Sequence, residues 1–156
     1  MIEEGQPAPD FVLATDNRGK VQLSKLKGHP VVVYFYPKDD TSGCTREAQA
    51  FTQLAKDFAK AGVRVIGISP DSVEKHAKFR SKYDLEVDLA ADEDKKAAEA
   101  YGVWVEKSMY GRKYMGIERS TFLIDAKGRV ANVWRKVKVP GHAEAVLAAV
   151  KTLVAK

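Results

Sequence analysis

The only cysteine of this chain, Cys44, lies between an apolar run and a stretch with helical spacing. The run from Val31 to Tyr36 is β-branched and aromatic and ends at Pro37, which is typical of a buried strand that enters a turn. The sequence then predicts a helix from about Gly43 to Ala61 whose buried face begins at the cysteine. The residues that share this face recur three or four positions apart and are Cys44, Ala48, Phe51, Ala55 and Phe58.

A thiol at the start of a helix has a particular chemical setting. The first turn leaves backbone N–H groups without partners, and these groups stabilise an anion together with the positive end of the helix dipole. The position therefore favours a thiolate at Cys44, which is the nucleophilic form of cysteine. The alternative is an inert cysteine that packs as a small hydrophobic side chain, and position alone does not separate the two.

A longer motif surrounds the cysteine. Pro37, Thr41 and Cys44 have the spacing Pro-x-x-x-Thr-x-x-Cys, and the stretch from Tyr36 to Thr45 reads Tyr-Pro-Lys-Asp-Asp-Thr-Ser-Gly-Cys-Thr. This stretch resembles the active-site motif of peroxiredoxins, most of all that of the peroxiredoxin Q (bacterioferritin comigratory protein) subfamily. Further matches follow in order along nearly the whole chain, at residues 67–72, 107–111 and 116–122.

The resemblance implies an oxidoreductase, a thiol-dependent peroxidase for antioxidant defence and redox homeostasis, with no cofactor and no metal. Cys44 would be the peroxidatic nucleophile, which hydrogen peroxide or an organic hydroperoxide oxidises to a sulfenic acid. Thr41 would hydrogen-bond the thiolate and the peroxide, and Pro37 would shield the site. Arg119 would supply a guanidinium that Glu47 orients. Without the resemblance, Thr41 fits a helix cap, Pro37 a strand end and Arg119 a surface cation.

The chain departs from this subfamily at the second thiol. Where many members carry a resolving cysteine, this sequence has Gln49 in the first helix and Arg80 near the expected place in the second. A 1-Cys mechanism follows, in which an external thiol reduces the sulfenic acid through a mixed disulfide. The expected reductant is thioredoxin, with glutaredoxin and glutathione as alternatives. Two other hypotheses stay open, a non-enzymatic redox sensor or holdase and an inert thioredoxin-like interaction module.

The order of the predicted elements indicates a thioredoxin-like α/β fold. A hairpin around residues 16–19 is followed by a strand, helix and strand from Val31 to Ile68, which form a parallel βαβ unit. Residues 121–134 then read as a second hairpin before a C-terminal helix at about 146–154. We expect a central mixed β-sheet flanked by helices, with an N-terminal β-hairpin, and one domain over residues 1–156.

The remaining segments are less regular. A helix is expected from Asp71 or Ser72 to Tyr83, with His76 exposed on it, and a short strand within residues 85–91 precedes a further helix that Asp92 caps. Residues 103–116 lack a clean period. We expect them to form a loop that either walls the thiol pocket or fills a peripheral part of the core.

Composition argues against several classes of function. The 26 basic and 21 acidic residues are interspersed, so the net charge of +5 indicates an ordinary solvated surface rather than a nucleic-acid-binding stripe. No apolar run approaches the ~18–20 residues that span a bilayer, and the start of the chain lacks a secretory-signal pattern. His29 has no partner at metal-ligand spacing. We therefore expect a cytoplasmic protein without nucleic-acid or membrane partners, and the resemblance implies a monomer.

Overall fold

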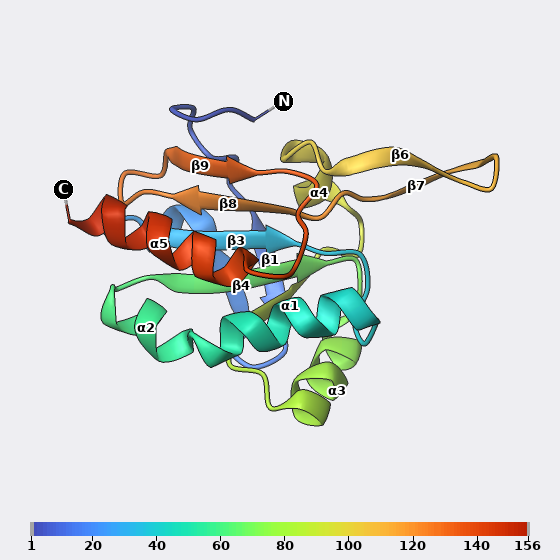
Figure 1. Cartoon of the computed structure of the whole chain (residues 1–156), viewed down its shortest axis with the longest axis horizontal. Coiled ribbons are helices and arrows are strands. Elements are labelled where there is room, and N and C mark those ends of the chain that lie inside the picture. Colours follow the sequence, from blue (N-terminus) through green and yellow to red (C-terminus); the bar gives the residue numbers. More distant parts are fainter. Residues whose placement is uncertain (1, 156) are drawn as a thin grey trace.

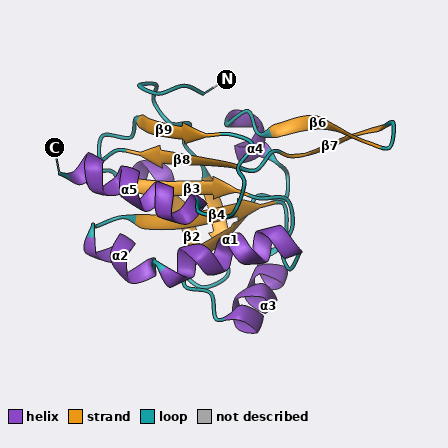
Figure 2. Cartoon of the chain, in the orientation of Figure 1, coloured by secondary structure: helices purple, strands orange, loops and turns teal. Residues whose placement is uncertain are grey.

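The computed structural model describes residues 2–155 and shows a mixed β-sheet with helices on its faces (Figures 1 and 2). Within these residues the main sheet has seven strands in the order β2-β1-β5-β4-β3-β8-β9. β3 pairs in parallel with β4 and antiparallel with β8, so it lies inside the sheet. The strands are β1 (Val12–Thr15), β2 (Lys20–Gln22), β3 (Val31–Phe35), β4 (Arg64–Ser69), β5 (Asp88–Ala91), β8 (Ser120–Ile124) and β9 (Val130–Trp134).

This arrangement is the thioredoxin-like α/β fold predicted from the sequence, and β1 and β2 form the predicted N-terminal hairpin. One face of the sheet is covered by α1 (Ser42–Gln53), α2 (Ala55–Lys60), α3 (Val73–Tyr83) and α5 (His142–Val154). The 3-10 helix η1 (Leu23–Leu26) and α4 (Lys96–Ala100) contribute to the core on the other face. None of the described helices combines the length and apolarity that a bilayer crossing requires.

β3 divides the core because successive side chains of a strand point to opposite faces. Val32 and Tyr34 pack with the face that carries α1 and α5, whereas Val33 and Phe35 pack with the face that carries α4. Every residue of β3 is buried. The strand therefore holds the loop that follows it at a rigid edge of the sheet, where α1 begins.

The helix predicted over residues 43–61 is divided in two. Leu54, at the junction of α1 and α2, has φ −99° and ψ 8°, and its N–H donates to the Phe51 carbonyl at 3.2 Å. That bond spans three residues instead of four, so the α-helical ladder is interrupted. Phe51 of α1 and Phe58 of α2 still pack together in the core, with their ring centroids 5.9 Å apart. Because both helices bury their apolar residues in the same core, the helical spacing of those residues in the sequence continues across the break.

The prediction of a loop at residues 103–116 is wrong. The segment forms an antiparallel hairpin of β6 (Trp104–Met109) and β7 (Arg112–Ile117) that projects from the body of the molecule (Figure 1). Tyr110 and Gly111 turn the chain with φ of 53° and 78°, as a two-residue hairpin turn requires. Most of its side chains are exposed, and Tyr110 is 98% exposed. Because neither face of the outer hairpin is buried, the sequence has no apolar alternation there that would indicate strands.

α3 begins and is anchored through side chains. Ser72 is the N-cap, and its Oγ accepts from the Lys75 N–H at 3.2 Å, so of the two predicted starts, Asp71 and Ser72, the structure has Ser72. Arg80, near the place where a second cysteine was expected, donates to both carboxylate oxygens of Asp16 and to the carbonyls of Leu85 and Val87. This one side chain joins α3 to the β1–β2 turn and to the segment that leads into β5.

Candidate active site

Cys44 lies in the first turn of α1 with its side chain in the core. Thr41 is the N-cap, and the Thr45 N–H donates to the Thr41 carbonyl at 2.8 Å. The N–H groups of the three residues between them precede this first helical bond, so they form the positive end of the helix. Cys44 is 2% exposed and belongs to the same buried cluster as Tyr34 and Phe51. A charge on this sulfur therefore needs partners inside the fold.

Arg119, between β7 and β8, is such a partner. Its Nη2 donates to Cys44 Sγ at 3.3 Å, and its Nη1 donates to Glu47 Oε1 at 2.7 Å. Burial alone would lower the pKa of Arg119, but the charges of Glu47 and Cys44 and their hydrogen bonds raise it. The guanidinium therefore stays charged beside the sulfur, where a positive charge favours the thiolate.

Glu47 follows Cys44 on the same side of α1 and is 1% exposed. Burial raises its pKa to about 7, although the charge of Arg119 acts in the opposite direction. Its Oε1 binds Arg119, while Oε2 is buried and has no hydrogen-bond partner within residues 2–155. This carboxyl group therefore titrates near neutral pH and shares the guanidinium with the sulfur.

The lack of a side chain at Gly43 leaves space for the guanidinium of Arg119. A Cβ at this position would lie 3.1 Å from Arg119 Nη2 and 3.8 Å from its Cζ. The approach of Arg119 to Cys44 thus depends on the missing side chain of the preceding residue. Gly43 was not predicted as a site residue, although a glycine inside the first turn of a helix is a detectable signal because glycine disfavours helix.

Thr41 and Pro37 are near the thiol in the chain, but the structure does not connect their side chains to it. Thr41 is exposed, and its Oγ1 donates to the Lys38 carbonyl at 2.8 Å. In the part of the chain that the structure describes, Thr41 makes no side-chain hydrogen bond to Cys44. Pro37 is partly buried and directly follows the buried end of β3. The structure thus groups Cys44, Arg119 and Glu47, and the roles of Thr41 and Pro37 stay predictions.

The prediction that His76 is exposed is wrong, because the side chain is fully buried beneath the loop that precedes α1. Its Nδ1 lies 2.6 Å from Asp39 Oδ2, and its Nε2 lies 3.0 Å from the Ala90 carbonyl oxygen. The Tyr36 hydroxyl donates to the other oxygen of Asp39 at 2.6 Å. The sequence predicted an exposed side chain because imidazole is polar. In the fold, residues that are distant in the sequence supply the hydrogen-bond partners of this ring.

Two further groups respond to the charge of Arg119. Burial and, after it, the guanidinium lower the pKa of Lys107 on β6. The same two causes lower the pKa of His142 to about 4, so this ring is neutral near pH 7, with its Nε2 2.8 Å from Thr121 Oγ1. Burial is the larger cause of both shifts, and of these three side chains Arg119 makes the direct contact with the sulfur.

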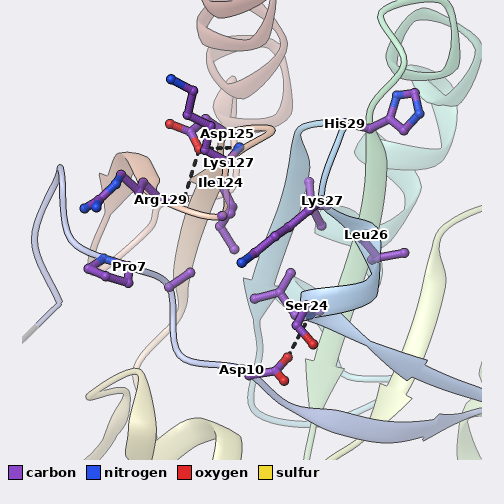
Figure 3. Close-up of a pocket in the computed structure, with 14 residues that line it drawn as sticks. Pro7, Asp10, Ser24, Leu26, Lys27, His29, Ile124, Asp125, Lys127 and Arg129 are labelled. Atoms are coloured by element: carbon purple, nitrogen blue, oxygen red, sulfur yellow. Dashed lines mark hydrogen bonds between the residues drawn. The ribbon is translucent and has the colours of Figure 1, made fainter.

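A cavity of about 300 Å³ lies at the other end of β3, away from the thiol (Figure 3). Its carboxylates are already engaged, since Asp10 accepts from the Ser24 N–H at 2.8 Å and Asp125 accepts from the N–H groups of Lys127 and Arg129. It is lined by the N-terminal segment, η1 and the β8–β9 turn, and it contains no cysteine. We therefore place the candidate active site at Cys44.

The chain is similar to known proteins over nearly its whole length. Residues 4–133 match the model of a family described as the AhpC/TSA family. Peroxiredoxin Bcp of Bacillus subtilis is 50% identical over 155 residues, which cover 99% of each protein. The solved structure of the Xanthomonas campestris bacterioferritin comigratory protein, described with its alkyl peroxide reduction activity, has a TM-score of 0.91 and 42% identity over 97% of this chain and 99% of that one. A yeast mitochondrial 1-Cys peroxiredoxin, described as resolved through glutathione and thioredoxin systems, has a TM-score of 0.82 and 26% identity, covering 98% of this chain and 76% of that one.

Proposed function

Because this chain belongs to the AhpC/TSA family and is a thiol peroxidase of the peroxiredoxin type, we propose that it reduces hydrogen peroxide and organic hydroperoxides through Cys44. The observation that carries the proposal is the charged guanidinium of Arg119, whose Nη2 lies 3.3 Å from the sulfur. The alkyl peroxide reduction described for the Xanthomonas campestris relative supports the same class of substrate.

In the first step the Cys44 thiolate attacks one oxygen of the peroxide. A sulfur–oxygen bond forms and the oxygen–oxygen bond breaks, so that Cys44 is oxidised to a sulfenic acid. The second oxygen leaves with the electron pair of the broken bond and takes up a proton, which yields water or an alcohol. Negative charge grows on this departing oxygen, and fixed donors such as the Arg119 guanidinium and the N–H groups at the start of α1 lower the barrier.

The other residues of the site have supporting roles in this proposal. Glu47 orients Arg119 through their 2.7 Å contact. Thr41, an exposed residue, binds the thiolate and the peroxide through its hydroxyl, which exchanges its bond to the Lys38 carbonyl for these partners when substrate arrives. Pro37 shields the site at the end of β3. No side chain of this set needs a metal or an organic cofactor for the reaction.

A thiol from another molecule completes the cycle. It attacks the sulfenic sulfur and releases water, which leaves a mixed disulfide on Cys44. A second external thiol then reduces this disulfide and restores the Cys44 thiol. The sequence holds one cysteine, so no internal thiol competes for the sulfenic acid. The description of the yeast 1-Cys relative supports thioredoxin or glutathione as reductants, and glutaredoxin has the same thiol chemistry.

We also propose that the protein works as a monomer in the cytoplasm. In the proposed reaction Arg119 contacts Cys44 and Glu47 of the same chain. Size-exclusion chromatography with light scattering, in the reduced and the peroxide-treated state, tests the monomer, and fractionation of the native cells tests the compartment. A dimer in the reduced state would contradict the first expectation.

The decisive experiment follows Cys44 directly. Peroxide consumption is measured by stopped flow for the wild type and Cys44→Ser, with thioredoxin, glutaredoxin or glutathione as the reductant, and mass spectrometry identifies the adduct on Cys44. We expect turnover with at least one reductant in the wild type and none in Cys44→Ser. Equal consumption by both proteins would reject the proposal, and oxidation without turnover would indicate a redox sensor.

A further inference from the structure

A buried polar cluster lies outside the thiol site and joins the loop before α1 to α3 and β5. At its centre are His76, which is fully buried, and Asp39, which is 9% exposed. His76 Nδ1 lies 2.6 Å from Asp39 Oδ2, and His76 Nε2 lies 3.0 Å from the Ala90 carbonyl oxygen. Both ring nitrogens therefore face oxygen atoms.

These contacts determine how many protons the cluster holds. A backbone carbonyl can only accept, so Nε2 of His76 must carry a hydrogen to bond Ala90. If the ring carried no other hydrogen, the Nδ1 lone pair would face a carboxylate oxygen at 2.6 Å, which is repulsive. A second hydrogen must therefore lie between His76 and Asp39.

Tyr36 does not remove this requirement. Burial, followed by the charge of Tyr34, raises the pKa of Tyr36 well above its ordinary value, so its hydroxyl stays protonated. That hydroxyl donates to Asp39 Oδ1 at 2.6 Å and leaves Oδ2 to His76. Imidazole is ordinarily a stronger base than a carboxylate, so we assign the second hydrogen to Nδ1. The pair is then an imidazolium and a carboxylate, neutral overall, which avoids a single unpaired charge in the core.

Asp39 is also held through its backbone. Its N–H donates to Asp71 Oδ2 at 2.7 Å, and the Ser69 hydroxyl donates to the same oxygen at 2.7 Å. The next residue, Asp40, has φ 59°, and Thr41 then occupies the N-cap position of α1. Asp39 is thus fixed from both its side chain and its backbone, immediately before the turn that sets the start of the helix.

We propose that His76 is a positioning residue for the thiol. With hydrogens on both ring nitrogens it holds Asp39, and through Asp39 it holds the loop from Pro37 to Thr41 in the conformation that places Cys44 Sγ against Arg119. The inference rests on the proposed function of Cys44 and adds a residue that touches neither the sulfur nor the peroxide.

The first test counts hydrogens and does not depend on activity. Nitrogen-15 NMR of histidine-labelled protein, at a pH about one unit above the value where a free imidazole loses its proton, reports on each ring nitrogen. We expect hydrogens on both nitrogens of His76, with exposed His29 as the reference for a ring in solvent. In Asp39→Asn the amide supplies the hydrogen between the side chains, so we expect His76 to keep only the hydrogen on Nε2. A wild-type His76 ring with one hydrogen overturns the inference.

The second test measures positioning by the single-turnover rate at which peroxide oxidises Cys44. We expect His76→Leu to slow this step by roughly 10²-fold, because small misplacements at a reacting centre have effects of that order. Asp39→Asn keeps the hydrogen-bond pattern and should stay within about threefold of the wild type, and the matched control His29→Leu should not change the rate. A wild-type rate in folded His76→Leu would limit the residue to a role in stability and overturn the proposal.

Two further outcomes are also decisive. If His76→Leu does not fold, the oxidation rate of Cys44 in Asp39→Asn decides the test alone. A large loss of that rate in Asp39→Asn would contradict a neutral pair of side chains that shares a hydrogen. If the wild type itself does not react with peroxide, the proposed function fails separately. The alkylation rate of Cys44 by iodoacetamide then replaces the peroxide rate, and an equal alkylation rate in the wild type and His76→Leu overturns the positioning role.

Discussion

At the scale of single residues, the contact between Arg119 and Cys44 depends on an absent side chain. Gly43→Ala would place a Cβ 3.1 Å from Arg119 Nη2 and displace the guanidinium. We expect the oxidation rate of Cys44 to fall about tenfold, a partial loss compared with removing a whole donor. The free energy of unfolding should hold or rise by up to ~1 kcal/mol, because alanine favours helix over glycine.

Two measurements check this expectation together, stopped-flow oxidation by peroxide and urea unfolding. Ser42→Ala is the matched control, since Ser42 is an exposed residue of the same turn. A Gly43→Ala protein that oxidises at the wild-type rate would show that the position of the guanidinium does not limit the reaction.

Glu47 makes stability depend on pH. Its pKa is raised from 4.5 to about 7, so the folded protein holds a proton that the unfolded chain releases between these values. The stabilising effect is complete below about pH 4.5 and is lost as the pH rises through about 7. Its size is about 3 kcal/mol at most. Urea unfolding at about pH 5 and about pH 8 should show this loss in the wild type and a smaller one in Glu47→Gln, and equal pH dependence in both would contradict it.

At the scale of elements, α3 is held by Arg80. The Asp16 carboxylate that binds Arg80 is 1% exposed, so removing the guanidinium leaves a buried charge and two carbonyls without this donor. We expect Arg80→Ala to lower the free energy of unfolding by about 2–3 kcal/mol. The control is the exposed ion pair between Lys82, on the same helix, and Asp40, in the loop before α1, and Lys82→Ala should cost much less stability than Arg80→Ala. Equal small losses in both variants would contradict the anchoring role.

The pairing of β3 with β4 contains a less favourable feature. Tyr34 lies opposite Gly67, and a Cβ on that glycine would be 2.6 Å from Tyr34 Cζ, so the ring occupies the space above the glycine. The Tyr34 hydroxyl is buried there without a hydrogen-bond partner among the described residues. We expect Tyr34→Phe to raise the free energy of unfolding by about 1 kcal/mol.

Tyr101→Phe is the matched control for this change. The Tyr101 hydroxyl donates to the Pro9 carbonyl at 2.6 Å, so its removal should lower the free energy of unfolding by about 1 kcal/mol. Urea unfolding of both variants gives the comparison. A loss of stability in both would indicate that the Tyr34 hydroxyl has a partner.

At the scale of the whole molecule, one sulfur must perform the entire redox cycle. With excess peroxide and no thiol, the sulfenic acid has no internal partner, and we expect it to go on to sulfinic acid. Intact-mass analysis should show two added oxygen atoms on a monomer, and prior addition of thioredoxin or glutathione should prevent them. A covalent dimer as the main product would show instead that two Cys44 side chains can meet.

The sequence was most informative where a segment has one buried face. The apolar spacing around Phe51 predicted a helix where α1 lies, and the β-branched run of β3 predicted a buried strand. The prediction failed where contacts distant in the sequence decide, as for His76, whose partners come from two other segments, the loop before α1 and β5. Arg119 is like any other arginine without the family motif, because nothing local indicates that the fold brings it to Cys44.

The β6–β7 hairpin has a practical consequence. It extends away from the seven-stranded sheet as a separate two-stranded sheet (Figure 1), and Tyr110 at its tip is 98% exposed. Such a tip is a permissive place for an inserted peptide or a protease cut. A fluorescent tag placed between Tyr110 and Gly111 would therefore provide a reporter on the working enzyme with little disturbance of its core.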